Sequence, residues 1–155
     1  QEIYLFNSSI RDNICMYKDI DDKFIMEACK DSGLADFISE VSLDYVVGQN
    51  GAMLSGGQKQ KIALARALVH NSPVIIFDEA TSNTDVYSEH QINGLLHTKL
   101  KEKTVIIITH KQEILKEADQ IIMLKDGAVV GSGVYDDLSK DNLEFKNMLN
   151  MGEKY

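Results

Sequence analysis

Two uninterrupted apolar runs in the second half of the chain restrict its fold more than any other feature. Residues 74–77 read VIIF and residues 104–109 read TVIIIT. Runs of β-branched and aromatic residues without alternation are typical of strands covered on both faces, as in parallel sheets. Residues 86–100 between them read as a helix, and parallel strands need such a crossover. The sequence therefore predicts an α/β fold.

The same alternation of helix and strand continues towards the C-terminus. Residues 111–118 (KQEILKEA) predict a helix. The stretch DQIIMLKDGAVVGSG that follows predicts two strands joined by a tight turn at Asp126 and Gly127, because Asp-Gly favours hairpin turns.

The first half of the chain is instead mainly helical. Asp21 is a candidate N-cap and Gly33 a candidate stop for one helix, and LADFIS predicts a second. The segment 58–71 after LSGGQ is rich in alanine and leucine and predicts a buried helix. We therefore expect a helical subdomain over residues 1–72 and the α/β core over residues 73–155.

Charge and composition exclude several classes of protein. The net charge is −8 and no basic stripe is present, which argues against nucleic-acid binding. No apolar run approaches the roughly 18 to 20 residues that cross a bilayer, so we expect any membrane part outside these residues. Cys15 and Cys29 lack metal-ligand spacing and indicate reduced, buried thiols in a cytosolic protein.

Polar groups follow both predicted parallel strands at the point where each strand ends. Asp78 and Glu79 come directly after the first strand, and His110 follows the second. Because ligands of open parallel sheets bind at the carboxyl ends of the strands, these three residues are candidate site residues. The alternative for each is an ordinary polar residue in a turn.

The stretch LSGGQ, residues 54–58, has the composition of an anion site. Ser55 offers a hydroxyl donor, and Gly56 and Gly57 let backbone N–H groups approach an anion closely at the positive end of the following helix. The alternative is a plain glycine turn before a helix.

The chain resembles the ATP-binding-cassette (ABC) ATPases in several motifs that occur in the family's order: LSGGQ, VIIFDEATS, SNTD and a histidine after TVIIIT. QEIYLFNSSIRDNI at the start resembles the Q-loop and the segment after it in exporter-type cassettes. The resemblance covers essentially the whole chain. It implies a partial ABC-type P-loop NTPase fold in a bacterial exporter, with ATP and Mg²⁺ as cofactors.

The resemblance implies a role for each strand-end residue. Asp78 matches the Walker B aspartate that helps to hold Mg²⁺ through water, and Glu79 the carboxylate that polarises the attacking water. His110 matches the switch histidine that contacts the γ-phosphate. Gln1 matches the Q-loop glutamine, which links the metal and the attacking water to the transmembrane partner.

The same resemblance implies that the site is shared between two cassettes. Ser55, Gly56, Gly57 and Gln58 match the signature motif, which in this family acts on ATP held by the opposite subunit of a head-to-tail dimer.

Two partners follow from the resemblance. Ser82 and Asp85 belong to the stretch that matches the D-loop, which runs between paired cassettes. The expected partners are thus a second nucleotide-binding domain and a transmembrane domain in the same parent chain, at the cytoplasmic face of the cell membrane. The Ser-Asn-x-Asp form of the D-loop is similar to that of bacterial peptide or bacteriocin exporters, and two residues do not decide a substrate.

One motif of the family is absent from the sequence. No G-x-x-x-x-G-K-[ST] occurs in the 155 residues. We therefore expect the chain to be the C-terminal portion of a cassette that starts at the Q-loop, and to be inactive by itself. Two alternatives stay open: a soluble ABC ATPase that acts on DNA or ribosomes, and a non-enzymatic half-module that acts in trans.

Overall fold

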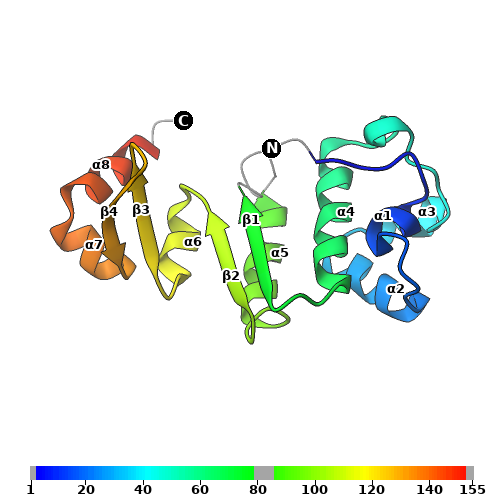
Figure 1. Cartoon of the computed structure of the whole chain (residues 1–155), viewed down its shortest axis with the longest axis horizontal. Helices are drawn as coiled ribbons and strands as arrows, with labels where there is room; N and C mark the ends of the chain where they lie inside the picture. The colour runs from blue at the N-terminus through cyan, green and yellow to red at the C-terminus, as the bar shows by residue number, and fades with distance from the viewer. Residues whose placement is uncertain (1–2, 79–85, 153–155) are drawn as a thin grey trace. The chain divides into compact units, whose positions relative to one another are not determined.

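The computed structural model describes residues 3–78 and 86–152 (Figure 1). It forms two compact units, Gln1–Ile107 and Ile108–Tyr155. Within the described ranges no helix has the length and hydropathy needed to cross a bilayer. The elements are α1 (Ile10–Cys15), α2 (Asp22–Asp31), α3 (Ala35–Val41), η1 (Gln49–Gly51), α4 (Gly56–Val69), β1 (Val74–Asp78), α5 (Val86–His97), β2 (Thr104–Ile108), α6 (Gln112–Glu117), β3 (Ile121–Lys125), β4 (Ala128–Gly133), α7 (Tyr135–Asp141) and α8 (Leu143–Gly152).

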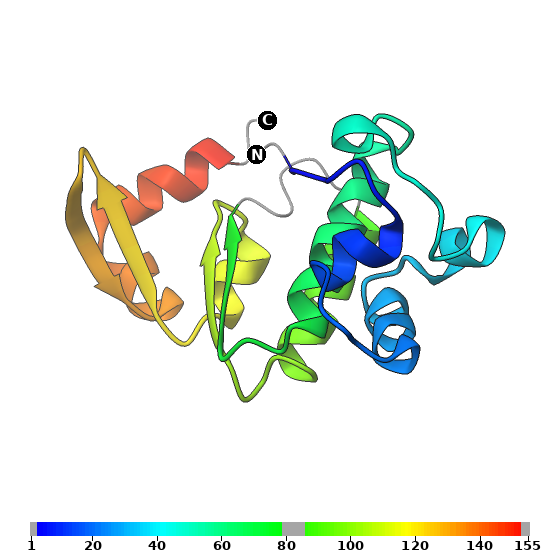
Figure 2. The ribbon, with the colours of Figure 1, turned by 45° about the vertical axis from the view of Figure 1, so that its right-hand side comes forward.

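Helices α1 to α4 share one hydrophobic core in the first unit. Asp21 caps α2 by accepting the N–H of Lys23 at 2.8 Å, and the chain leaves the helix through Gly33 at φ +69°, as the sequence predicted. Both ribbon views place α1 beside α4 (Figure 2). The least exposed side chains of this core are those of Leu5, Ile10, Ile14, Ile25, Cys29, Leu34, Val47, Ile62 and Ala65.

Both cysteines lie in this core as free thiols, which confirms their prediction as reduced and buried. Burial raises the pKa of Cys15, and it raises the pKa of Cys29 to about 11. Because the thiolate is the reactive form, both groups are inert near neutral pH.

Strands β1 and β2 pair and run in the same direction, with α5 between them in sequence (Figure 1). Ile75 and Phe77 of β1 are buried in a cluster with Leu95 of α5. The opposite face is open in the described chain, because Ile76 is 62% exposed and Val74 48%. The expectation that this strand is covered on both faces is therefore wrong for these residues, since α5, with Leu64 and Leu68 of α4, packs against one side only.

The second unit is built on a hairpin. β3 and β4 pair antiparallel, and Asp126 and Gly127 form the turn with φ of 52° and 78°, which confirms the predicted hairpin. α7 and α8 contribute Leu138 and Phe145 to a core on one face of the hairpin, and Phe145 is completely buried. The predicted boundary at residue 72 between a helical subdomain and an α/β core stays a prediction.

Candidate functional site

The residues of LSGGQ begin helix α4. Ser55 is the N-cap: its Oγ accepts the N–H of Gln58 at 3.2 Å, and Oε1 of Gln58 accepts the N–H of Ser55 at 2.8 Å. Gly56 and Gly57 are therefore the first two residues of the helix, and the expectation that they precede it is wrong. Ser-x-x-Gln is the spacing of a capping box, so the sequence did carry this signal.

Neither glycine of this first turn is required by the chain itself. Both are exposed, neither has a positive φ, and a Cβ added at Gly56 or Gly57 would meet no atom of the described residues within 4 Å. Glycine nevertheless weakens a helix relative to alanine, by up to about 1 kcal/mol per residue in an interior position. The first N–H groups of a helix have no intrahelical acceptor, so these two donors face outwards at its positive end. The hydroxyl hydrogen of Ser55 is likewise available, because Oγ acts as the acceptor in the capping box.

The loop before α4 fixes where this helix starts. Gly48, Asn50 and Gly51 have left-handed φ values of 77°, 51° and 66° and fold the loop back on itself. Leu54 is buried, and its N–H donates to the carbonyl of Gly51 at 3.0 Å. The residue directly before Ser55 is thus anchored in the core.

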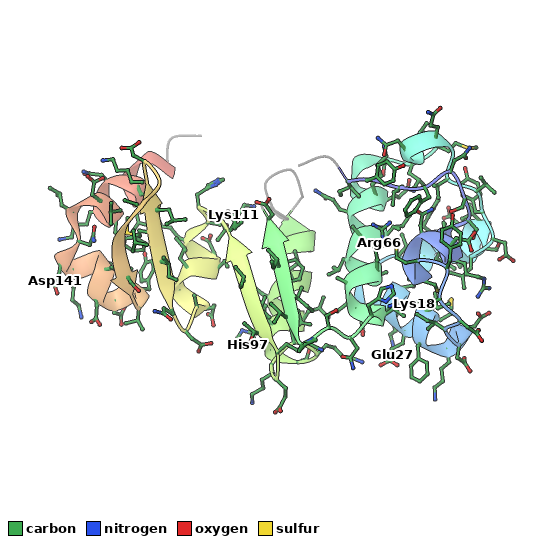
Figure 3. All side chains as sticks on the ribbon, in the orientation of Figure 1. Lys18, Glu27, Arg66, His97, Lys111 and Asp141 are labelled. Carbon is green, nitrogen blue, oxygen red and sulfur yellow. The ribbon has the colours of Figure 1, made fainter. Side chains whose placement is uncertain are left out.

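Further along α4, Arg66 ties the helix to the N-terminal segment. Figure 3 labels this side chain on α4, and its Nε donates to the carbonyl of Asn13 at 2.7 Å. Both Nη atoms lie 3.4 Å from the carbonyl of Tyr4. Burial lowers the pKa of Arg66. Asn13 is itself fully buried and bonded to Phe6 through both its Oδ1 and its Nδ2.

The remaining predicted site residues are described only in part. Asp78 is half-buried at the end of β1. His110 is exposed after β2, at the start of the second compact unit, so the two strand-end residues belong to different units. The structure thus brings together Ser55, Gly56, Gly57 and Gln58 at the start of α4, whereas Asp78 and His110 are each placed only within their own unit. Four predicted residues lie outside the described ranges: Gln1, Glu79, Ser82 and Asp85.

Asp78 fits a role in Mg²⁺ binding. Among residues 3–78 and 86–152 no group of three or more His, Cys, Asp or Glu could hold a metal ion. Mg²⁺ in phosphoryl-transfer sites is commonly held by one or two carboxylates, with water and phosphate oxygens as its other ligands. A single half-buried carboxylate at the carboxyl end of a parallel strand is compatible with that ligand set.

An exposed aromatic cluster was missed by the sequence analysis. Tyr4 and Tyr17 are each 65% exposed, and Phe6 lies between them, with ring centroids 5.2 Å from Tyr4 and 6.0 Å from Tyr17. The signal was the alternation in YLF, which puts Tyr4 and Phe6 on one side of an extended segment and the buried Leu5 on the other. The cluster is therefore a candidate interaction surface.

Comparison with known proteins gives consistent similarities. A family model described as ABC transporter matches residues 1–82. The toxin RTX-I translocation ATP-binding protein of Actinobacillus pleuropneumoniae is 46% identical over 144 residues, which are 91% of this chain and 20% of that protein. The lactococcin-G-processing and transport ATP-binding protein of Lactococcus lactis is 42% identical over 154 residues, 97% of this chain and 22% of that protein.

Two further similarities concern a lipid transporter and a solved structure. The ATP-dependent lipid A-core flippase of Escherichia coli (strain K12) is 39% identical over 142 residues, 89% of this chain and 24% of that protein. The structure of a bacterial Atm1-family ABC exporter with ATP bound has a TM-score of 0.91 and 32% sequence identity, and the match covers all of this chain and 28% of the exporter chain. The chain thus spans 20–28% of the length of the four proteins named here.

Proposed function

The chain belongs to the ABC transporter family, and from this we propose that it is part of the ATP-binding and ATP-hydrolysing domain of an exporter, which powers transport by ATP-driven dimerisation. The relatives named above translocate a toxin, transport lactococcin G or flip lipid A-core, according to their names. The cassette is the part that such exporters have in common, so ATP hydrolysis is the activity we assign to this region.

The observation that carries the proposal is the open first turn of α4. Ser55, Gly56 and Gly57 present a hydroxyl and two backbone N–H groups at the positive end of a fourteen-residue helix, with no side chain of the described residues in front of the glycines. Backbone donors at a helix N-terminus favour phosphate. We propose that they bind the phosphates of an ATP molecule held by a partner cassette.

The strand-end residues supply the rest of the proposed chemistry. Asp78 would hold Mg²⁺ through water, together with Gln1, and Glu79 would polarise the attacking water. When bound, Mg²⁺ stabilises the charge that develops on the phosphoryl oxygens. His110 would contact the γ-phosphate and hold it in line for attack. Phosphoryl transfer depends mainly on such positioning and charge stabilisation.

Two partners belong to the proposal. A second nucleotide-binding domain would pair head to tail, with Ser82 and Asp85 of the D-loop at the junction. A transmembrane domain in the same parent chain would dock on the aromatic cluster of Tyr4, Phe6 and Tyr17, because that cluster directly follows the Q-loop and is exposed. The proposal includes a position of the domain at the cytoplasmic face of the cell membrane.

A substitution at Glu79 tests the proposed function in the full-length protein. Glu79→Gln removes the proposed base but keeps its shape, so we expect ATP to bind and turnover to fall by at least about a hundredfold, the usual contribution of a general base. Glu102→Gln, which neutralises an exposed carboxylate after α5, is the control and should leave turnover unchanged. Unchanged turnover in Glu79→Gln would remove Glu79 from this role. The 155 residues alone lack a P-loop sequence, and we expect them not to hydrolyse ATP.

A further inference from the structure

Lys59 stands in an unexpected place for a cation. It is the fourth residue of α4 and directly follows LSGGQ. A positive charge in the first turn of a helix opposes the helix dipole, so the position needs a compensating reason. One reason would be a direct contact with the phosphate that the turn binds. The contacts of Lys59 indicate a different one.

The ammonium group of Lys59 is used within the chain. Its Nζ donates to the carbonyl of Asn50 at 2.9 Å, in a part-buried position. The hydrocarbon stem lies over Gly51, because a Cβ added there would be 3.1 Å from Cε and 3.6 Å from Cδ of Lys59. Lys59 therefore closes over the loop that leads into α4.

The N-terminal segment holds the same loop from the other side. The Oδ1 of Asn50 accepts the N–H of Leu5 at 3.4 Å, and the added Cβ at Gly51 would lie 2.8 Å from Cδ1 of Leu5. Gly51, at φ +66°, is thus enclosed between Leu5 and the stem of Lys59, so a larger residue there would be strained by the backbone conformation and would displace one of these side chains.

From these contacts we propose that Lys59 is a positioning residue: with Asn50, Gly51 and Leu5 it forms a clasp that holds the start of α4, and it is not itself a phosphate ligand. The clasp fixes Leu54, whose N–H donates to Gly51, and Leu54 is followed at once by Ser55. The direction of the donors of Ser55, Gly56 and Gly57 depends on this anchorage. The expected effect on ATP turnover rests on the proposed function. The contacts that form the clasp do not depend on it.

The test uses the full-length protein with Lys59→Met, which keeps an apolar stem and removes the ammonium, and Lys59→Arg, which keeps a donor long enough to reach Asn50. Amide hydrogen exchange reports the clasp without reference to activity. In Lys59→Met we expect the amides of Met53 and Leu54, which donate to Val47 and Gly51, to exchange at least roughly tenfold faster, and in Lys59→Arg to stay protected. Unchanged exchange in Lys59→Met overturns the proposal.

Steady-state kinetics separate positioning from binding. A positioning role lowers kcat for ATP by at least roughly tenfold in Lys59→Met, keeps KM for MgATP within about twofold, and is restored in Lys59→Arg. A selective rise in KM with unchanged kcat means that Lys59 binds phosphate directly, and overturns the proposal. Gly51→Ala disturbs the same clasp, so the loss of kcat in the double variant should be smaller than the product of the two single losses. A loss equal to that product also overturns the proposal. If the wild-type protein does not hydrolyse ATP but the exchange pattern is as expected, the proposed function fails and the clasp stands.

Discussion

The first turn of α4 and strand β4 both contain glycines, but the space around those glycines differs. Within residues 3–78 and 86–152, an added Cβ meets nothing within 4 Å at Gly56 or Gly57, whereas at Gly131 it would lie 2.7 Å from Nδ2 of Asn142 and 3.2 Å from the sulfur of Met123. Packing inside the chain accounts for Gly131. Nothing among the residues the structure describes packs against the pair in α4. Gly94 of α5 is equally open, so it is the position of the pair at a helix N-terminus, with two outward-facing N–H groups, that fits a ligand approaching from outside.

Gly57→Ala should change stability and ATP turnover in opposite directions. Gly57→Ala should raise the free energy of unfolding slightly, because alanine favours a helix and its Cβ meets open space. The same methyl group would stand in front of the first-turn donors. ATP turnover of the full-length protein should then fall by about a hundredfold, the scale of losing one preorganised donor. A turnover assay and urea unfolding check the two effects.

Gly94 provides the matched control for this largest effect. It lies in α5, is exposed, and has no atom of the described part of the chain within 4 Å of an added Cβ. Gly94→Ala should stabilise the protein by about 0.5–1 kcal/mol and leave turnover unchanged. If Gly57→Ala behaves like Gly94→Ala in both assays, the pair in α4 has no external ligand and the comparison fails.

A moderate loss of stability is expected at Gly131. Asn142 is held on both sides: its Oδ1 accepts the N–H of Phe145 at 2.9 Å, and its Nδ2 donates to the carbonyl of Val130 at 3.4 Å. Gly131→Ala should displace this side chain and lower the free energy of unfolding by about 1–3 kcal/mol. Gly133→Ala, whose Cβ would be 3.6 Å from Leu138, is the control on the same strand and should cost less. Equal unfolding midpoints for the two variants would show that Asn142 moves aside freely.

Local signals predicted the elements whose structure depends on local chemistry. The cap at Asp21, the stop at Gly33 and the turn at Asp126 and Gly127 were all visible, because capping and turn geometry are set within a few residues. The coverage of Ile76 was misjudged, since a run of apolar residues does not say how many faces of a sheet are covered. The sequence alone predicts no element over α7 and α8. Both helices are short, and they are held in place by the packing of Leu138 and Phe145 in the core.

The candidate site was predictable in its residue types and less so in its geometry. The composition of LSGGQ indicates an anion site, whereas the start of the helix at Gly56 is set by the capping box between Ser55 and Gln58. The clasp of Lys59 and Asn50 could not be found from spacing, since it depends on the left-handed backbone of the loop. The aromatic cluster required knowing that Tyr17, thirteen residues after Tyr4, returns to the same surface.

The smallest expected effect concerns His70, at the C-terminal end of α4. His70 caps the helix at its C-terminal end, and its Nδ1 lies 3.5 Å from Nζ of Lys18. Burial, and then the charges of Lys18 and Arg66, lower the pKa of His70. The unfolded state therefore binds a proton more readily than the folded state. The stability contributed by neutral His70 is fully present above the unfolded pKa of about 6.5 and is lost as pH falls through the lower folded pKa.

Lys18→Gln sharpens this prediction without touching the histidine. Removing the lysine charge weakens one of the causes that lower the pKa of His70, so the loss of stability between pH 7.5 and pH 5.5 should become smaller than in the wild type. His70→Gln should remove the same component of the pH dependence altogether. Urea unfolding at the two pH values measures both. A steeper loss of stability in Lys18→Gln than in the wild type would contradict this expectation. It would mean that the contact of Lys18 with His70 stabilises the end of α4 more than the lysine charge opposes protonation of the histidine.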